Sequence, residues 1–206
     1  MTRRTYVIVD GENIDATLGG SVLGRRPQPE ERPRWERVTS FVEERWGQPV
    51  TGLFFLNASN GNLPIGFVQA LLAMDYRPIP LSGRPDEKVV DLGILRTLEA
   101  LRARPDADVV LGSHDADFAE HLAALLETEA REHEDVEGLE GLGGSDPVGQ
   151  RRRIGVLGFR EFTSTTLAIE GVEHFDLEYD VRAFNAELPR VRIIPLAEFD
   201  PEFFLR

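Results

Sequence analysis

Cysteine is absent from the 206 residues, and so are long apolar runs. A chain without cysteine forms no disulfide, zinc–thiolate site or thiol nucleophile, and this composition is typical of the cytoplasm. No run reaches the roughly 18 apolar residues that a membrane-spanning helix needs. The start, MTRRTYVIVDGEN, lacks the apolar core and cleavage site of a signal peptide. These absences predict a cytoplasmic protein with no membrane partner.

Lysine is almost absent as well. Of the 23 lysine and arginine residues, Lys88 alone is lysine, and it lies three positions before Asp91 in the apolar helical run that follows. An exposed ion pair on one helix face is the simpler interpretation. The neighbouring Val89, Val90 and Leu92 instead surround the carboxylate with apolar groups, where it is costly without a cation. A compact ammonium also suits phosphate contact or water activation beside a metal.

Negative charge is in excess, at a net −13, and it is unevenly distributed. Residues 127–146 hold eight carboxylates against Arg131, a net −7, in a glycine-rich stretch without apolar periodicity. We expect an acidic surface insertion near 130–150 and a C-terminal extension from about 181, both attached to one domain that spans residues 1–206.

Short apolar strands alternate with amphipathic helices along the chain. The expected strands are residues 5–9, 50–56, 77–81, 108–112, 154–159 and 191–196. The expected helices are one from residue 12, then 35–46, 64–75, 86–103, 115–129 and a short one at 164–170, with a long loop at 18–34. This alternation predicts an α/β fold, a Rossmann-like three-layer α/β/α sandwich with a mainly parallel sheet of five or six strands.

Carboxylates follow the first and fourth expected strands and open the helix between them. Asp10 ends the first strand, Asp115 and Asp117 follow the fourth, and Asp91 lies at the start of the preceding helix. Ligand sites of parallel α/β sheets lie at the carboxyl ends of the strands, so these acids are expected to converge if the two strands are neighbours. All-oxygen ligation suits Mg²⁺ or Mn²⁺. Each acid also has a purely structural interpretation, as a helix cap or a first-turn acid.

Several common catalytic motifs are missing. The chain has no Gly-x-Ser-x-Gly elbow, no P-loop and no Gly-x-Gly-x-x-Gly after the first strand, which weakens the esterase, NTPase and dinucleotide-binding interpretations.

Three segments together resemble the NYN domain, a branch of the PIN-like nuclease superfamily. They are VDGEN at 9–13, K-x-x-D at 88–91 and S-x-D-x-D-F at 113–118, and the resemblance covers roughly residues 5–180. It implies a PIN-like fold and metal-dependent, endonucleolytic cleavage of RNA, with Asp10, Asp91, Asp115 and Asp117 as ligands of Mg²⁺ or Mn²⁺. The chain departs from the family at His114, where the family usually has glycine.

The resemblance also implies supporting residues around those ligands. Asn13, Lys88 and Ser113 would support the site or contact phosphate, with Lys88 positioning phosphate or polarising the attacking water. Ser164 and Arg160 belong to a stretch after the fifth strand that is similar to the family's, where hydroxyl groups near the site are expected. Helix capping is an equally good interpretation of Ser164.

RNA is the expected partner, and a homo-oligomer is possible. The cations considered for RNA contact are Arg25, Arg26, Arg32, Arg34, Arg151, Arg152, Arg153 and Arg160. The acidic insertion is hypothesised to fold over these arginines and compete with RNA. Two alternatives stay open: a non-catalytic RNA-binding or protein-interaction module, and a Toprim-like phosphotransfer domain that would pair Glu12 with the Asp-x-Asp segment.

Overall fold

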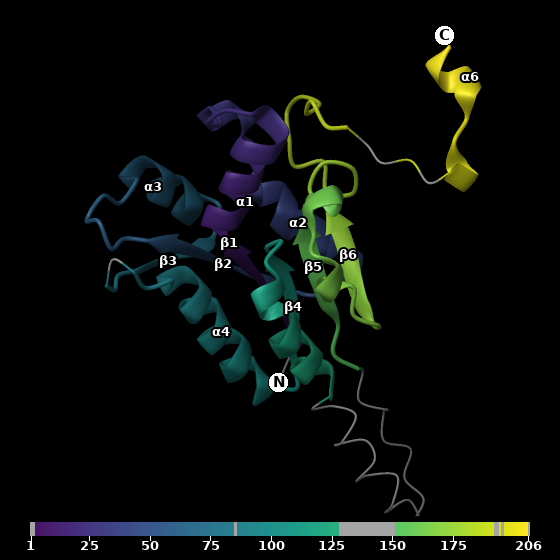
Figure 1. Cartoon of the computed structure of the whole chain (residues 1–206). Helices are drawn as coiled ribbons and strands as arrows, with labels where there is room; N and C mark the ends of the chain where they lie inside the picture. The colour runs from purple at the N-terminus through teal and green to yellow at the C-terminus, as the bar shows by residue number, and fades with distance from the viewer. Residues whose placement is uncertain (1–2, 85, 128–150, 192–193, 195, 206) are drawn as a thin grey trace, which may run out of the picture.

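Six parallel strands form one sheet in the order β3-β2-β1-β4-β5-β6 (Figure 1). The computed structural model describes residues 3–84, 86–127, 151–191, 194 and 196–205. The strands are β1 (Arg4–Asp10), β2 (Val50–Asn57), β3 (Tyr76–Leu81), β4 (Ala107–Gly112), β5 (Ile154–Gly158) and β6 (Val172–Asp176). All five neighbouring pairs are parallel, so the expected α/β class is confirmed, with six strands.

β1 and β4 are neighbours at the centre of the sheet, and the strand order changes direction between them. Val7, Ile8 and Val9 of β1 are fully buried, as are Val110 and Leu111 of β4, because both faces of these strands are covered by helices. The point where the order of an open parallel sheet reverses is its usual ligand site.

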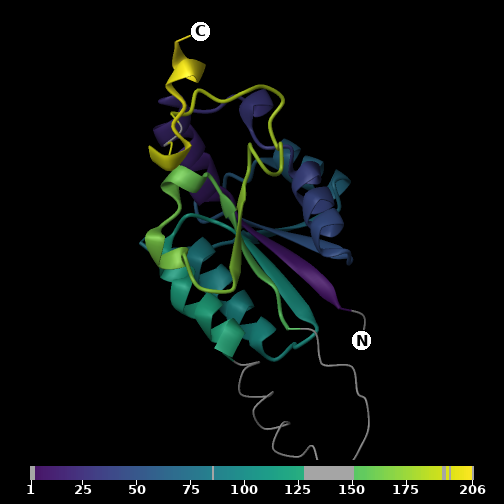
Figure 2. The ribbon, with the colours of Figure 1, turned by 90° about the vertical axis from the view of Figure 1, so that its right-hand side faces the viewer.

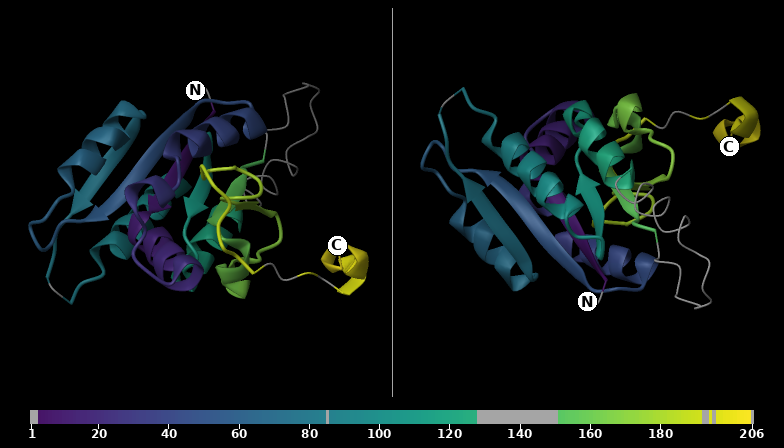
Figure 3. Two further views of the ribbon diagram at one scale, coloured as in Figure 1. Left: turned by 90° about the horizontal axis from the view of Figure 1, so that it is seen from above. Right: turned by 90° about the horizontal axis from the view of Figure 1, so that it is seen from below.

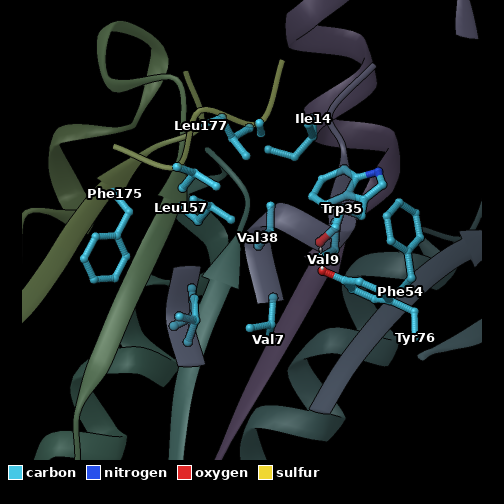
Figure 4. Close-up of a cluster of buried hydrophobic side chains, with 14 of the residues drawn as sticks. Val7, Val9, Ile14, Trp35, Val38, Phe54, Tyr76, Leu157, Phe175 and Leu177 are labelled. Atoms are coloured by element: carbon cyan, nitrogen blue, oxygen red, sulfur yellow. Dashed lines mark hydrogen bonds between the residues drawn. The ribbon is translucent and has the colours of Figure 1, made fainter. Parts of the chain in front are cut away.

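Helices cover both faces of the sheet and complete the three layers (Figure 2). On one face lie α1 (Gly11–Thr17), α2 (Trp35–Trp46) and α3 (Ile65–Ala73), which share a core with the sheet. Ile14 of α1 and Trp35 of α2 lie in this core (Figure 4), and Leu71 of α3 belongs to it as well. On the other face lie α4 (Val89–Arg102) and a helix described from residue 119 to 127. Ile94, Leu98 and Leu122 of these two helices pack on the sheet.

Short helices fill the connections. They are η1 (Leu18–Leu23), η2 (Pro29–Glu31), η3 (Ala116–Phe118), η4 (Arg160–Phe162), η5 (Thr165–Leu167), η6 (Leu196–Glu198) and α6 (Pro201–Phe204). The loop expected at 18–34 is wrong in its first part, since η1 is a π-helix that continues α1. Leu18 and Val22 are buried there, so tertiary packing offsets the low helix propensity of Gly19 and Gly20. The short helix expected at 164–170 is the 3₁₀ turn η5.

The sixth strand is β6, and the strand expected at 191–196 is wrong. Residues 191 and 194 are not in a strand, and the side chain of Val191 is 89% exposed. β6, with the sequence VEHFD, has two apolar residues among three polar ones and lies at the edge of the sheet, where one side of the ladder faces solvent. A search for apolar runs misses such a strand, because only Phe175 carries a large buried apolar side chain.

The acidic insertion predicted near 130–150 lies outside the described residues. None of the helices in the described part of the chain has the length and apolar character required to span a bilayer.

Candidate metal centre

Four acids predicted as metal ligands lie at the carboxyl-end edge of the sheet, near the β1–β4 switch point. Asp10 is the last residue of β1, and Asp115 and Asp117 follow β4 at the start of η3. Asp91 lies in the first turn of α4, where its negative charge interacts favourably with the helix dipole. Figure 3 (left) looks down on this edge, with the purple α1 lying across it.

Asp91, Asp115 and Asp117 form a compact triad. Each offers a carboxylate oxygen, and these three oxygens lie within 4.8 Å of one another. The side chain of Asp91 is 20% exposed and that of Asp117 is 59% exposed, so the triad opens to solvent. Two of its members come from the turn after β4 and one from α4, and only the folded sheet brings these segments together.

Lys88 is the cation of this triad. Its Nζ lies 3.3 Å from Asp91 Oδ2 and 3.4 Å from Asp117 Oδ2. Hydrogen bonds to these two carboxylates raise the pKa of Lys88. The i,i+3 ion pair expected within one helix is therefore only half of the arrangement, because Lys88 also joins α4 to the turn after β4.

Asp10 belongs to the same edge but is not a member of the triad. Among the described residues, the group of acids with metal-ligand spacing consists of Asp91, Asp115 and Asp117. The buried Asp10 caps α1 by accepting a hydrogen bond from the Asn13 backbone N–H, 3.1 Å away. Its pKa is raised from an ordinary 3.8 to about 6, chiefly by burial and also by the charge of Asp91, although hydrogen bonds from Asn13 and Ser113 oppose the shift.

Ser113 connects Asp10 to the triad. The fully buried hydroxyl donates to Asp10 Oδ2 over 3.2 Å and accepts from the Asp115 backbone N–H over 3.2 Å. Asp115 in turn caps η3, accepting from the Asp117 backbone N–H at 3.0 Å. Asp10 and Asp115 are thus helix caps, as the structural interpretation expects. Asp115 is both a cap and a member of the triad.

Glu12 is a further candidate for the acidic site, which the sequence suggests only under the Toprim-like alternative. Its pKa is raised by burial and by the charge of Asp91, which shows that it lies within electrostatic reach of the triad. Its signal in the sequence was its place in the segment VDGEN, one residue before Asn13.

His114 joins the segments that carry the acids. Its backbone N–H donates to Asn13 Oδ1 over 2.9 Å, and Nδ1 lies 2.8 Å from the same oxygen and 3.2 Å from Thr17 Oγ1. Nε2 accepts from the Phe159 backbone N–H over 2.7 Å, so the proton of the neutral ring lies on Nδ1. Burial lowers the pKa of His114 to about 4, which keeps the ring neutral.

Gly158 is the residue that makes room for this imidazole. A Cβ at position 158 would lie 2.6 Å from His114 Nε2. The ring also stacks on Phe159, with 5.7 Å between the centroids. Sequence reasoning missed the roles of Thr17 and Gly158, and the only signal was the histidine that stands where the NYN family usually has glycine.

Ser164 and Arg160 make other contacts than the ones expected for substrate binding. The Ser164 side chain caps η5 through the Thr166 backbone N–H, and its own N–H donates to the His114 carbonyl over 3.4 Å. Arg160 forms an ion pair with Asp180 at 3.0 Å. The structure therefore does not bring these two residues into the triad.

The arginines considered for RNA contact are largely engaged with the chain itself. Their ion pairs are Arg25 with Glu31, Arg32 with Asp15 and Arg34 with Glu36. Arg26 and Arg151 are exposed. Residues 151–153, which were considered for RNA contact, lie away from the acidic edge, because they precede β5 and so lie at the amino end of the parallel sheet. There Arg152 is buried against the carbonyls of Leu101 and Arg104.

The donor set fits a hard divalent cation. The triad supplies only carboxylate oxygens, which are the ligands that Mg²⁺ and Mn²⁺ prefer. Among the described residues, the cation that forms ion pairs with the triad is Lys88, whose side chain is 69% exposed and therefore displaceable. Burial is the chief cause that raises the pKa values of Asp10 and Glu12, and the charge of Asp91 adds to both shifts, a repulsion that a cation would relieve.

The fold and the acids at the carboxyl-end edge of the sheet together define the chain as a Rossmann-like α/β protein with a cluster of carboxylates at its switch point. A protein of unknown function from Vibrio parahaemolyticus, VPA0982, has a similar structure, with a TM-score of 0.57 and 18% sequence identity over 87% of this chain and 95% of that one. At this identity the similarity shows the fold alone. No protein-family model and no curated protein matches the chain.

Proposed function

We propose that this protein is a Mg²⁺- or Mn²⁺-dependent ribonuclease of the NYN type, within the PIN-like superfamily, that cleaves RNA endonucleolytically in the cytoplasm. The observation that carries the proposal is the meeting of Asp91, Asp115 and Asp117 within 4.8 Å at the sheet's switch point, beside the chain's single lysine. The lack of cysteine supports the cytoplasmic location.

The residues of the edge have separate tasks in this reaction. The triad holds the cation, which when bound supplies the charge that activates water and stabilises the leaving oxygen. Lys88 offers its ammonium to a phosphate oxygen. Asp10, with a pKa of about 6, can hold or release a proton close to neutral pH. Asn13 and Ser113 hold these groups in place through the hydrogen bonds described above.

RNA is proposed as substrate because the three NYN-like segments include the triad, Lys88 and Asn13. The net charge of −13 disfavours nucleic acid at long range, so binding has to rely on the cation and on local contacts.

Neutralising one ligand tests the proposal. Asp91→Asn and Asp115→Asn should each lower cleavage of single-stranded RNA in Mg²⁺ or Mn²⁺ by about a thousandfold or more, because each removes charge from the ion's shell. Cleavage of labelled RNA is the measurement, with circular dichroism to show that the variants fold. Glu99→Gln, on the same helix as Asp91 and exposed beside Arg102, is the matched control and should keep full activity. Full activity in purified Asp115→Asn would remove the basis of the assignment.

Glu12 gives the Toprim-like alternative its one supporting observation, which is its electrostatic contact with Asp91. In the NYN-type site, Asp10→Asn should impair cleavage more than Glu12→Gln, and in a Toprim-like site the order should be reversed. A non-catalytic module would bind RNA with no turnover in either metal.

A further inference from the structure

Lys88 holds the position of a counter-ion in the triad. Its ammonium contacts one carboxylate oxygen of Asp91 and one of Asp117, on two different segments of the chain. Both distances, 3.3 and 3.4 Å, are those of ion pairs and are long for charge-assisted hydrogen bonds. The side chain is 69% exposed, so most of its surface is free of packing contacts.

We infer that Lys88 is a tethered cation that competes with the divalent ion for the triad, so that metal binding must first displace its ammonium from Asp91 and Asp117. This inference rests on the metal site proposed above and concerns its regulation. The residue sets a threshold: the site fills only when the free divalent ion is concentrated enough to replace an intramolecular lysine.

The electrostatics of the edge favour exchange over co-occupancy. The ligand oxygens of the triad span no more than 4.8 Å, and the ammonium already contacts two of the three carboxylates. A divalent ion in contact with the same carboxylates would lie within a few ångströms of the ammonium, where two cations repel strongly even at an effective dielectric constant of 20. Because the lysine stem is flexible and solvent-exposed, moving it away costs little beyond the loss of its two ion pairs.

The exchange also keeps the metal-free site folded. Three carboxylates with ligand atoms this close repel one another, and Lys88 offsets that repulsion until an ion arrives. Displacement then leaves the ammonium beside the loaded site, where a substrate phosphate is the next available anion.

Calorimetric titration with Mn²⁺ at low salt, on the full chain, tests the inference without measuring cleavage. Lys88→Met should bind Mn²⁺ about tenfold more tightly than the natural protein, since the competitor is removed. Lys88→Arg keeps the charge and should stay within about threefold of the natural affinity. Arg84→Met is the matched control, since it removes the same charge from an exposed position four residues earlier, and it should change the affinity less than twofold.

The outcomes separate this inference from the proposed function. Equal Mn²⁺ affinity in the natural protein and Lys88→Met overturns the competition and leaves the metal site standing. Equal gains in Lys88→Met and Arg84→Met also overturn it, because the effect is then that of net charge. No binding in either the natural protein or Lys88→Met refutes the metal site itself, and the inference with it. Binding only in Lys88→Met supports the competition in its strongest form.

Discussion

Two buried titratable groups in neighbouring turns influence stability in opposite directions. The pKa of Asp10 is about 6 in the folded chain against an ordinary 3.8, so the folded state binds more protons there and stability falls as pH rises from 4 to 6. The pKa of His114 is about 4 against 6.5, so the unfolded state binds more protons there and stability rises from pH 4 to 6.5. Between pH 4 and 6 the two effects largely cancel.

Asp10→Asn should separate the two effects. The amide oxygen can still cap α1, while the cost of a buried charge is lost, so we expect the variant to be about 2–3 kcal/mol more stable at pH 7 in the presence of a chelator. Its stability should also fall more steeply than the natural protein's on acidification from pH 6.5, because His114 then acts alone. Urea unfolding at several pH values is the measurement. A variant no more stable than the natural protein at pH 7 would contradict the raised pKa of Asp10.

Gly158→Ala tests how firmly His114 is held. The new Cβ would approach Nε2 to 2.6 Å, and the ring cannot turn away without losing the hydrogen bonds to Asn13 and Phe159. We expect a loss of about 1–3 kcal/mol in the free energy of unfolding. Gly158 is not among the glycines with positive φ, so the cost is one of space.

The matched background is His114→Gly, in which the obstacle is absent. There the cost of Gly158→Ala should shrink by about 1 kcal/mol or more, a coupling that urea unfolding of the four proteins measures as a double-mutant cycle. Additive effects would show that the two positions do not meet.

At the scale of elements, strand β4 has an aspartate with different partners at each of its two ends. Asp115 follows its carboxyl end and joins the triad, whereas Asp108 near its amino end is fully buried and accepts from Arg3, Arg153 and Gln48. Burial raises the pKa of Asp108, but the hydrogen bonds from Arg3 and Arg153 outweigh it and the pKa is lowered. Asp108 thus has cationic partners within the chain, whereas Asp115 lies beside two further carboxylates, Asp91 and Asp117.

Asp108→Asn and Asp115→Asn should therefore have opposite consequences. Asp108→Asn leaves two arginines without their shared carboxylate and should cost about 3 kcal/mol of stability, with Mn²⁺ affinity unchanged. Asp115→Asn should weaken Mn²⁺ binding strongly and cost little stability in a chelator. Urea unfolding and calorimetry on both variants form the test, and loss of Mn²⁺ binding in Asp108→Asn would mean that the sheet transmits the change to its far edge.

On the scale of the whole molecule, the divalent ion should stabilise the fold. An ion that binds only the folded state adds about 2.7 kcal/mol at a concentration one hundred times its Kd, because the unfolded chain has no triad. We expect saturating Mg²⁺ to raise the Tm by about 5 °C in the natural protein and to leave Asp115→Asn unchanged. Thermal unfolding with and without chelator measures this, and an equal shift in both proteins would point to unspecific binding of cations by an acidic chain.

Much of the architecture was predictable because it depends on local patterns. Apolar runs such as residues 5–9 and 108–112 read as buried strands, and helices between them require parallel crossovers. The edge strand β6 was missed because three of its five residues, Glu173, His174 and Asp176, are polar and lower its apolar signal. The π-helix η1 was missed because Gly19 and Gly20 indicate a loop unless Leu18 and Val22 have a core to enter.

The position of the acids at one edge of the sheet was also predictable from the sequence, because the carboxyl ends of parallel strands lie at the same edge. The alternation of strands and helices predicts Asp10, Asp91, Asp115 and Asp117 at one edge of the sheet, and the structure places them there. The sequence did not predict which of these acids form the triad. The structure separates Asp10, which is hydrogen-bonded to Ser113, from the triad. It also places Arg152 and Arg153 at the opposite edge of the sheet, where they bind backbone carbonyls and Asp108.

By itself, the amino-acid sequence determined the α/β class and the strand ends at which the carboxylates lie, because hydrophobic periodicity and the alternation of strands with helices are local properties. That β1 and β4 are neighbours was decided by the tertiary structure. Only the tertiary structure decided which three of those carboxylates share a centre, that Lys88 bridges two of them, and that His114 needs the space at Gly158. These depend on distances of a few ångströms between residues far apart in the chain, which packing sets and no local pattern records.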